Sequence, residues 1–103
     1  MDSRDYLLTT VKSKITEIDP DARIILFGSR ARGDFYEDSD WDFLILTKLS
    51  VNQDLKNRIS DSLFETELET ENVLTGLVHN MDSWSSYSNT PVFKNISRDG
   101  IEI

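Results

Sequence analysis

The sequence lacks cysteine altogether and has only two prolines and four glycines. Without cysteine, the protein has no disulfide, no thiolate zinc site and no cysteine nucleophile. It also lacks a signal peptide and any apolar run near the roughly 18 residues that a membrane span needs, so we expect a cytoplasmic protein with no membrane contact. Its 103 residues fit one domain, residues 1–103, because domains commonly have about 100–150 residues.

Basic side chains are scarce as well. Eleven lysines and arginines stand against 19 aspartates and glutamates, which gives a formal net charge of −8. An extensive nucleic-acid surface needs a basic face, so this function class is excluded except for a local patch at Arg30 and Arg32. The acidic excess also suits docking on a basic protein partner.

The spacing of apolar residues alternates between helical and strand-like periods, which predicts an α/β fold. The stretch at 83–91 predicts a loop or short helix. Helices are expected over 5–18, just after Gly28, from a cap at Ser50 or Asn52 to about Leu68, and over 92–96; strands are expected over 23–27, 42–47 and 73–79, with a small edge strand at 101–103.

The segment from Gly28 to Asp34 has the composition of a phosphate cradle. Gly28 ends the first predicted strand, and a glycine there permits a sharp turn and lets an anion approach the backbone. Ser29 follows with a hydroxyl suited to an N-cap, and the start of a helix favours negative charge. Arg30 and Arg32 supply guanidinium groups that suit phosphate oxygens. The alternative for both arginines is pairing with the nearby carboxylates of Asp34, Glu37 or Asp38.

Ten residues separate Ser29 from Asp40, and Asp40 and Asp42 open the second apolar run. Residues two apart on a strand share a face, so these carboxylates lie close together and repel each other. A divalent cation removes this conflict, and oxygen ligands suit Mg²⁺ or Mn²⁺ bound together with substrate phosphates. Trp41 points to the other face and is expected in the core. Taken alone, each half of this pattern also fits an ordinary turn or a solvated loop.

Together, Gly28-Ser29, the ten-residue gap and Asp40-x-Asp42 resemble the signature of the polymerase-β-like nucleotidyltransferase superfamily. The flanking Arg30–Gly33 and Ser39 look like its smallest members, the minimal nucleotidyltransferases or MNT domains. The resemblance implies the nucleotidyltransferase fold, a small mixed β-sheet with flanking helices. It also implies metal-dependent transfer of a nucleoside monophosphate, AMP from ATP, to a hydroxyl acceptor. MNT domains are commonly encoded beside a HEPN-domain protein, so the implied role is that of an antitoxin acting on a HEPN-type partner.

The same resemblance implies residue roles. Asp40 and Asp42 would hold the metal and act in catalysis, while Gly28 and Ser29 would hold the terminal phosphates. The family pattern also places a third carboxylate on a later strand, but the predicted strand at 73–79 contains none. The nearest candidates are Glu71, which adjoins the strand, and then Glu69; the alternative for both is a solvated glutamate.

Two other functions stay open. The chain can be a catalytically weak or inactive module that binds a nucleotide or a partner and neutralises that partner. It can also be a sensor whose assembly changes with nucleotide. Larger members of the superfamily carry a second helical domain that is not found here, so we expect the acceptor surface to come from a partner protein or from a second copy in a homo-oligomer.

Overall fold

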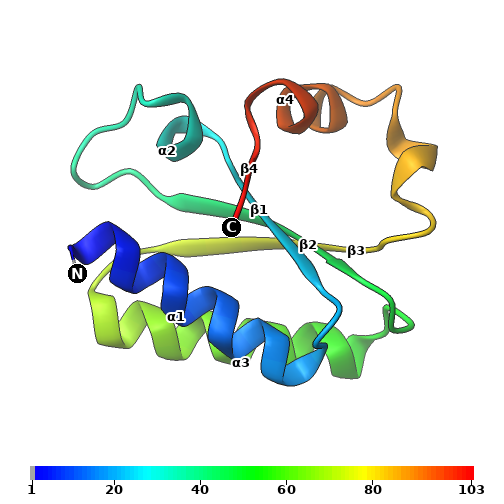
Figure 1. Cartoon of the computed structure of the whole chain (residues 1–103), viewed down its shortest axis with the longest axis horizontal. Coiled ribbons are helices and arrows are strands. Elements are labelled where there is room, and N and C mark those ends of the chain that lie inside the picture. Colours follow the sequence, from blue (N-terminus) through cyan, green and yellow to red (C-terminus); the bar gives the residue numbers. More distant parts are fainter. Residues whose placement is uncertain (1) are drawn as a thin grey trace.

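The computed structural model describes residues 2–103 and shows a four-stranded mixed sheet in the order β3-β2-β1-β4, with helices on both faces (Figure 1). β2 runs parallel to β3 and antiparallel to β1, and β1 runs antiparallel to β4. The predicted α/β class is confirmed. The elements are α1 (Ser3–Ile18), β1 (Arg23–Phe27), α2 (Ser29–Arg32), β2 (Trp41–Thr47), α3 (Gln53–Thr70), β3 (Leu74–Asn80), the 3₁₀ helix η1 (Trp84–Tyr87), α4 (Pro91–Asp99) and β4 (Ile101–Glu102).

Capping residues explain where the long helices begin. The side chain of Asp2 accepts a hydrogen bond from the amide of Asp5 at 2.8 Å, and that of Asn52 accepts one from the amide of Leu55 at 2.9 Å. Each satisfies a backbone donor that has no partner within its own helix. Of the two caps predicted for this helix, Ser50 and Asn52, it is therefore Asn52 that starts α3.

The alternating strands divide their side chains between two cores. Alternate residues of β2, including Trp41 and Phe43, face α1 and α3, which lie together on one side of the sheet (Figure 1). Trp41 is 5% exposed, which confirms its expected place in the core. The residues between them, such as Leu44, face α4 on the other side. Asp42 belongs to this second set, so its carboxylate lies on the face of the sheet that carries α4.

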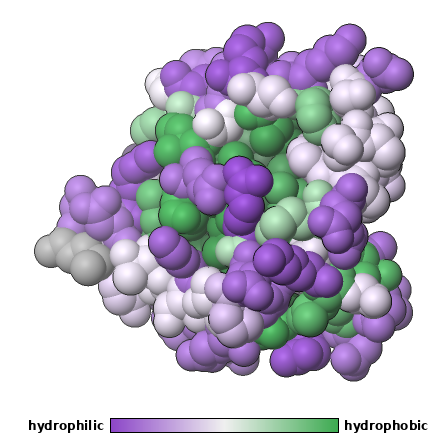
Figure 2. Space-filling model, turned by 45° about the vertical axis from the view of Figure 1, so that its right-hand side comes forward, coloured by the Kyte–Doolittle hydropathy of each residue, from purple (hydrophilic) through white to green (hydrophobic). Residues whose placement is uncertain are grey.

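The outer surface is mostly hydrophilic, but hydrophobic residues emerge together in the middle of the face shown in Figure 2. Among the exposed apolar side chains, Phe64 and Leu68 of α3 are 57% and 67% exposed. Within residues 2–103, no helix combines the length and the hydropathy that crossing a bilayer requires.

A buried carboxylate joins the end of α1 to the end of β2. Asp19 is 5% exposed and accepts hydrogen bonds from the hydroxyl of Thr47 at 2.7 Å, the amide of Lys48 at 3.1 Å and the amide of Asp21 at 3.0 Å. Burial, the largest single influence, raises the pKa of Asp19, but the hydrogen bonds and the charge of Lys48 together set it below its ordinary value.

Asp19→Ala is expected to lower the free energy of unfolding by about 1–3 kcal/mol at pH 7, because it leaves buried donors without an acceptor. The contribution of Asp19 is complete above its unfolded-state pKa of about 3.9 and is lost as the pH falls through its lower folded-state pKa. Urea unfolding followed from pH 7 to pH 2 measures both effects. Asp21→Ala, at an exposed position, is the control; an equal loss of stability in the two variants would contradict this account.

Candidate functional site

The turn after β1 depends on glycine. Gly28 has φ 75° and ψ −159°, a conformation that side-chain-bearing residues rarely adopt. It is the N-cap of α2, and its carbonyl accepts hydrogen bonds from the amides of Ala31 and Arg32, both at 3.1 Å. The sequence predicts Ser29 as the cap, and this is wrong by one residue: Ser29 is the first residue of the helix. The first amides of a helix have no intrahelical partner, so this turn presents hydrogen-bond donors.

The backbone of this turn lies directly against the carboxylate of Asp42. Phe27, the residue before Gly28, pairs with Asp42 in the antiparallel ladder of β1 and β2. A Cβ atom built on Gly28 would overlap the Oδ2 atom of Asp42. The structure therefore brings the glycine turn together with Asp42, one carboxylate of the acidic pair.

Asp40 and Asp42 are held unequally. Asp40 is exposed just before β2, whereas Asp42 is partly buried on the strand. Thr75 lies opposite Asp42 in the parallel ladder, and its hydroxyl donates to the Oδ1 atom of Asp42 at 2.5 Å. Asp42 is thus fixed by Thr75 on the β3 side and bounded by Gly28 on the β1 side.

Glu71 does not lie on the strand beside Asp40 and Asp42. It is an exposed residue that ends α3 with φ 56°, and its amide donates to the carbonyl of Glu67 at 2.8 Å. Among residues 2–103, no three or more histidine, cysteine, aspartate or glutamate side chains are grouped so that they could hold a metal ion. The residue of β3 beside Asp42 is Thr75, and Glu71 lies before that strand, at the end of α3. The catalytic role of Glu71 therefore stays a prediction.

Arg30 braces the loop between α2 and β2. The side chain is 8% exposed and donates from Nη2 to the carbonyls of Glu37 at 2.8 Å and Ser39 at 3.1 Å, and from Nε to Ser39 at 3.2 Å. Its guanidinium carbon lies 4.4 Å from the ring centroid of Phe35 and 4.5 Å from that of Trp41. This arrangement is neither of the two expected for Arg30, which were phosphate contact and pairing with a carboxylate. The guanidinium instead binds backbone carbonyls and packs on aromatic rings.

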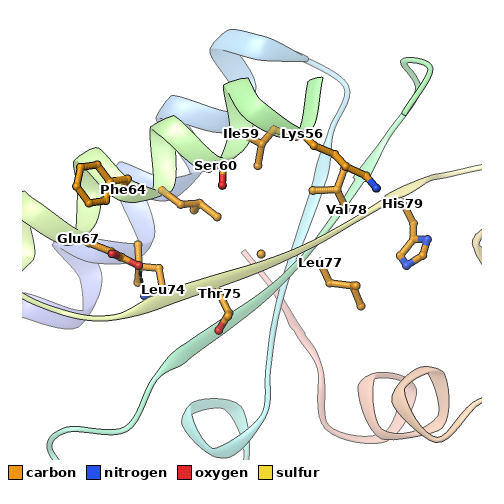
Figure 3. A pocket seen from close by; sticks show the side chains of 12 residues that line it. Lys56, Ile59, Ser60, Phe64, Glu67, Leu74, Thr75, Leu77, Val78 and His79 are labelled. Atoms are coloured by element: carbon orange, nitrogen blue, oxygen red, sulfur yellow. Dashed lines mark hydrogen bonds between the residues drawn. The ribbon is translucent and has the colours of Figure 1, made fainter. Parts of the chain in front are cut away.

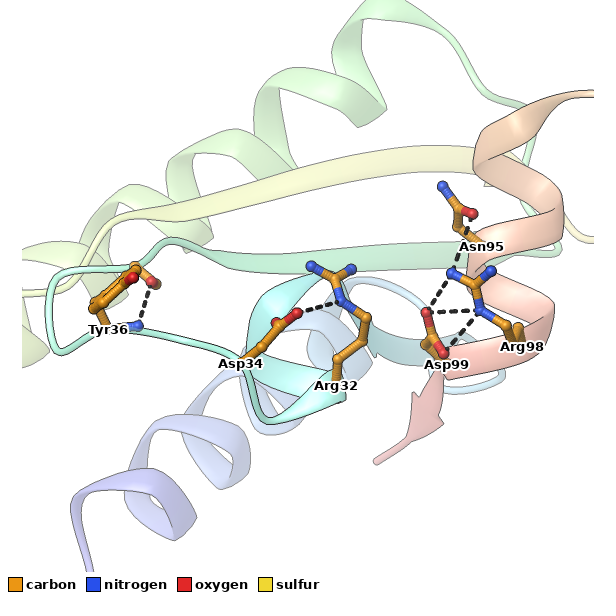
Figure 4. Close-up of polar contacts among 7 residues, drawn as sticks. Arg32, Asp34, Tyr36, Asn95, Arg98 and Asp99 are labelled. Carbon is orange, nitrogen blue, oxygen red and sulfur yellow. Dashed lines mark hydrogen bonds and ion pairs between the residues drawn. The ribbon is translucent and has the colours of Figure 1, made fainter.

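Arg32 is exposed and pairs with Asp34, as one of its two alternatives predicts, with Nε 3.1 Å from Oδ2 (Figure 4). Beside it, α4 contributes a second pair, Arg98 and Asp99, joined at 2.9 Å. The hydrogen bond from Arg98 and, further away, the charge of Arg32 hold the pKa of Asp99 below its ordinary value. Sequence reasoning missed Arg98, because only the packing of α4 on β1 brings it near α2.

His79 lies towards the opposite end of β3 from Thr75. Its ring packs 5.0 Å from the centroid of Trp84 and 4.6 Å from that of Tyr87. Burial, and then the charge of Lys56, lower the pKa of His79. It packs against η1 and pairs with Leu46 of β2, away from the acidic pair.

Gly28→Ala is expected to lower the free energy of unfolding by about 1–3 kcal/mol through backbone strain alone. A further loss is expected because the added methyl group displaces the carboxylate of Asp42. Gly33→Ala is a matched control: Gly33 has φ 91°, but nothing lies within 4 Å of a Cβ placed there. Denaturant unfolding of both variants separates strain from collision. Equal destabilisation in the two variants would show that Asp42 does not press on the turn.

Comparisons with known proteins found a matching family model and a solved structure of similar fold. A family model described as "Nucleotidyltransferase domain" matches residues 8–96. A solved structure described as "Crystal structure of the toxin-antitoxin with AMP-PNP" superposes with a TM-score of 0.64 over 99% of this chain and 72% of that chain. The identity is 13%, so this likeness concerns the fold. No curated protein matches the sequence.

Proposed function

The chain belongs to the nucleotidyltransferase domain family, and from this premise we propose that it transfers a nucleoside monophosphate from a nucleoside triphosphate, ATP, to a hydroxyl on a protein partner. The observation that carries the proposal is the contact between the Gly28 turn and the carboxylate of Asp42. A phosphate chain held by the turn would lie beside the carboxylates, which is where a metal-bound substrate has to be.

The residues at this place fit a divalent cation. Asp40 and Asp42 offer oxygen ligands, and Mg²⁺ or Mn²⁺ binds in proteins through one or two carboxylates together with substrate phosphates. Thr75 occupies Oδ1 of Asp42, which leaves Oδ2 at the side of the turn. When bound, the cation would neutralise phosphate charge and orient the reacting groups.

The chain's own contribution is binding and orientation. The amides and hydroxyl at Ser29 would hold the terminal phosphates beside the turn at Gly28, with Arg32 close by once it leaves Asp34. The acceptor hydroxyl oxygen would bond to the α-phosphorus as the bond from that phosphorus to pyrophosphate breaks, and the hydroxyl proton passes to solvent or to a base. Holding these groups in line and neutralising their charge accounts for most of such catalysis. Glu71 is the candidate third carboxylate, but it ends α3, and the β3 residue beside Asp42 is Thr75.

One observation favours a second function. Thr75 stands on β3 beside Asp42, where the family resemblance expects a carboxylate. A site with two carboxylates can hold a nucleotide yet transfer it poorly. The chain would then act by binding a HEPN-type partner, as an antitoxin that masks it. The similar toxin–antitoxin structure with AMP-PNP supports a protein partner and a nucleotide site for both functions.

Calorimetric titration of ATP and GTP, each with Mg²⁺ or Mn²⁺, tests the nucleotide site. We expect binding of ATP that disappears when EDTA removes the metal. Incubation with α-³²P-labelled ATP and the co-expressed partner then tests transfer. Label on the partner supports the transferase; binding without label, together with neutralisation of the partner, supports the binding module. No binding at about 1 mM nucleotide would overturn the transferase and would leave the binding module, which can mask its partner without a nucleotide.

A further inference from the structure

One edge of the sheet is long and unprotected. β3 is the terminal strand in the order β3-β2-β1-β4, and its residues Leu74–Asn80 include no aspartate, glutamate, lysine, arginine or proline. Such residues normally protect an exposed edge from pairing with another strand. The other edge strand, β4, has two residues. An edge like β3 is therefore expected to be covered by another strand.

The backbone groups on this edge can be assigned from the hydrogen bonds to β2. Trp41 donates from its amide to the carbonyl of Val73 at 2.9 Å, and Met81 donates to Thr47 at 2.8 Å. In a parallel ladder, alternate residues bond to the same neighbour, so the odd-numbered residues of β3 face β2 and the even-numbered residues face outward. The amide of Leu74 is satisfied by Glu67 at 2.9 Å. The amides and carbonyls of Gly76 and Val78 are thus directed to a further strand.

A groove follows this edge between β3 and α3. It has a volume of about 560 Å³ and is lined by apolar side chains of α3, including Leu63 and Phe64, and by the backbone of β3 (Figure 3). Phe64 is 57% exposed, and Leu68, one helical turn further on the same face, is 67% exposed. An added strand would have apolar surface beneath it.

Opposite charges stand at the two ends of the groove. Lys56 lies at the end with Val78 and His79, and Glu67 lies at the end with Leu74 (Figure 3). The two ends of the groove therefore carry opposite charges: a cation near the C-terminal end of β3 and an anion near its N-terminal end.

We propose that this edge binds a second copy of the chain, with the two β3 strands antiparallel about a two-fold axis near Gly76. A two-fold axis reverses the groove of the second copy. The Lys56 end of each copy then meets the Glu67 end of the other, so the same pair of opposite charges forms twice. Phe64 and Leu68 of the two copies face each other below a sheet that is continuous across both. None of these residues belongs to the proposed nucleotide site.

Sedimentation velocity over a range of concentrations tests the pairing. The wild-type mass is expected to rise from 11.9 kDa to twice that value. Lys56→Glu and Glu67→Lys each place like charges together at both ends, so each is expected to weaken association at least about tenfold. An equimolar mixture of these two variants restores opposite charges at both ends and is expected to dimerise again. Phe64→Ser, at an exposed position, is expected to weaken the dimer without affecting the fold.

Lys94→Glu makes the same change of charge on α4, away from the groove, and is expected to associate like the wild type. The pairing is overturned if the wild type sediments at 11.9 kDa up to about 1 mM, an outcome that would assign the edge to a strand from another protein. It is also overturned if Lys56→Glu dimerises like the wild type, or if the mixed variants stay monomeric.

Discussion

Asp42→Asn is expected to reduce metal-dependent nucleotide binding and transfer by at least about a hundredfold while the protein stays folded. The bound metal contributes several kcal/mol in such sites, and every 1.4 kcal/mol or so is a factor of about ten. Asparagine has the same shape as aspartate, and its carbonyl oxygen can still accept the hydroxyl of Thr75. Nucleotide binding should therefore fall because a negative charge and a metal ligand are lost, while the pairing of β2 with β3 is kept.

The measurement is a titration of ATP with Mg²⁺ into wild type, Asp42→Asn and Asp38→Asn, each checked by denaturant unfolding. Asp38 is an exposed carboxylate in the loop before the acidic pair, so its variant changes the net charge equally and should bind like the wild type. Undiminished binding and transfer by Asp42→Asn would remove the acidic pair from the site. If Asp42→Asn still neutralises the partner, the role of binding module gains support over that of transferase.

Much of this fold could be predicted because its elements are encoded by local signals. The strand at Arg23–Phe27 has the predicted bounds, because an apolar run ends at a glycine. The cap at Asn52 places the start of α3 in the same way. The contact between Gly28 and Asp42 also follows from the motif, once two neighbouring strands pair next to the turn.

What could not be predicted depends on contacts between distant segments. The register of the parallel strands places Thr75 beside Asp42, and these two strands are separated in the sequence by α3. No spacing along the chain specifies it, so sequence reasoning could only look for the nearest acid and selected Glu71. Arg30 differs for a similar reason. Its guanidinium lies between Phe35 and Trp41 only when the intervening loop closes over it.

Arg30→Ala is expected to lower the free energy of unfolding by about 2–4 kcal/mol. The change removes three hydrogen bonds to the carbonyls of Glu37 and Ser39 and a cation packed between two aromatic rings. Hydrogen bonds from a charged group contribute about 1.5–3 kcal/mol, and the rings add about 0.5–2 kcal/mol. Because Asp40 directly follows Ser39, a loosened loop should also weaken nucleotide binding.

Arg32→Ala is the control, because its exposed pair with Asp34 should contribute at most about 1 kcal/mol. Urea unfolding of both variants, with hydrogen exchange of residues 33–40, measures the effect. Arg30→Lys keeps the charge but cannot span the same carbonyls, so we expect an intermediate loss of stability. If Arg30→Ala keeps its stability and loses nucleotide binding, Arg30 does not stabilise the loop but contacts phosphate, as the sequence motif predicts. If stability and loop protection fall together, the arginine acts on the nucleotide through the loop that positions Asp40.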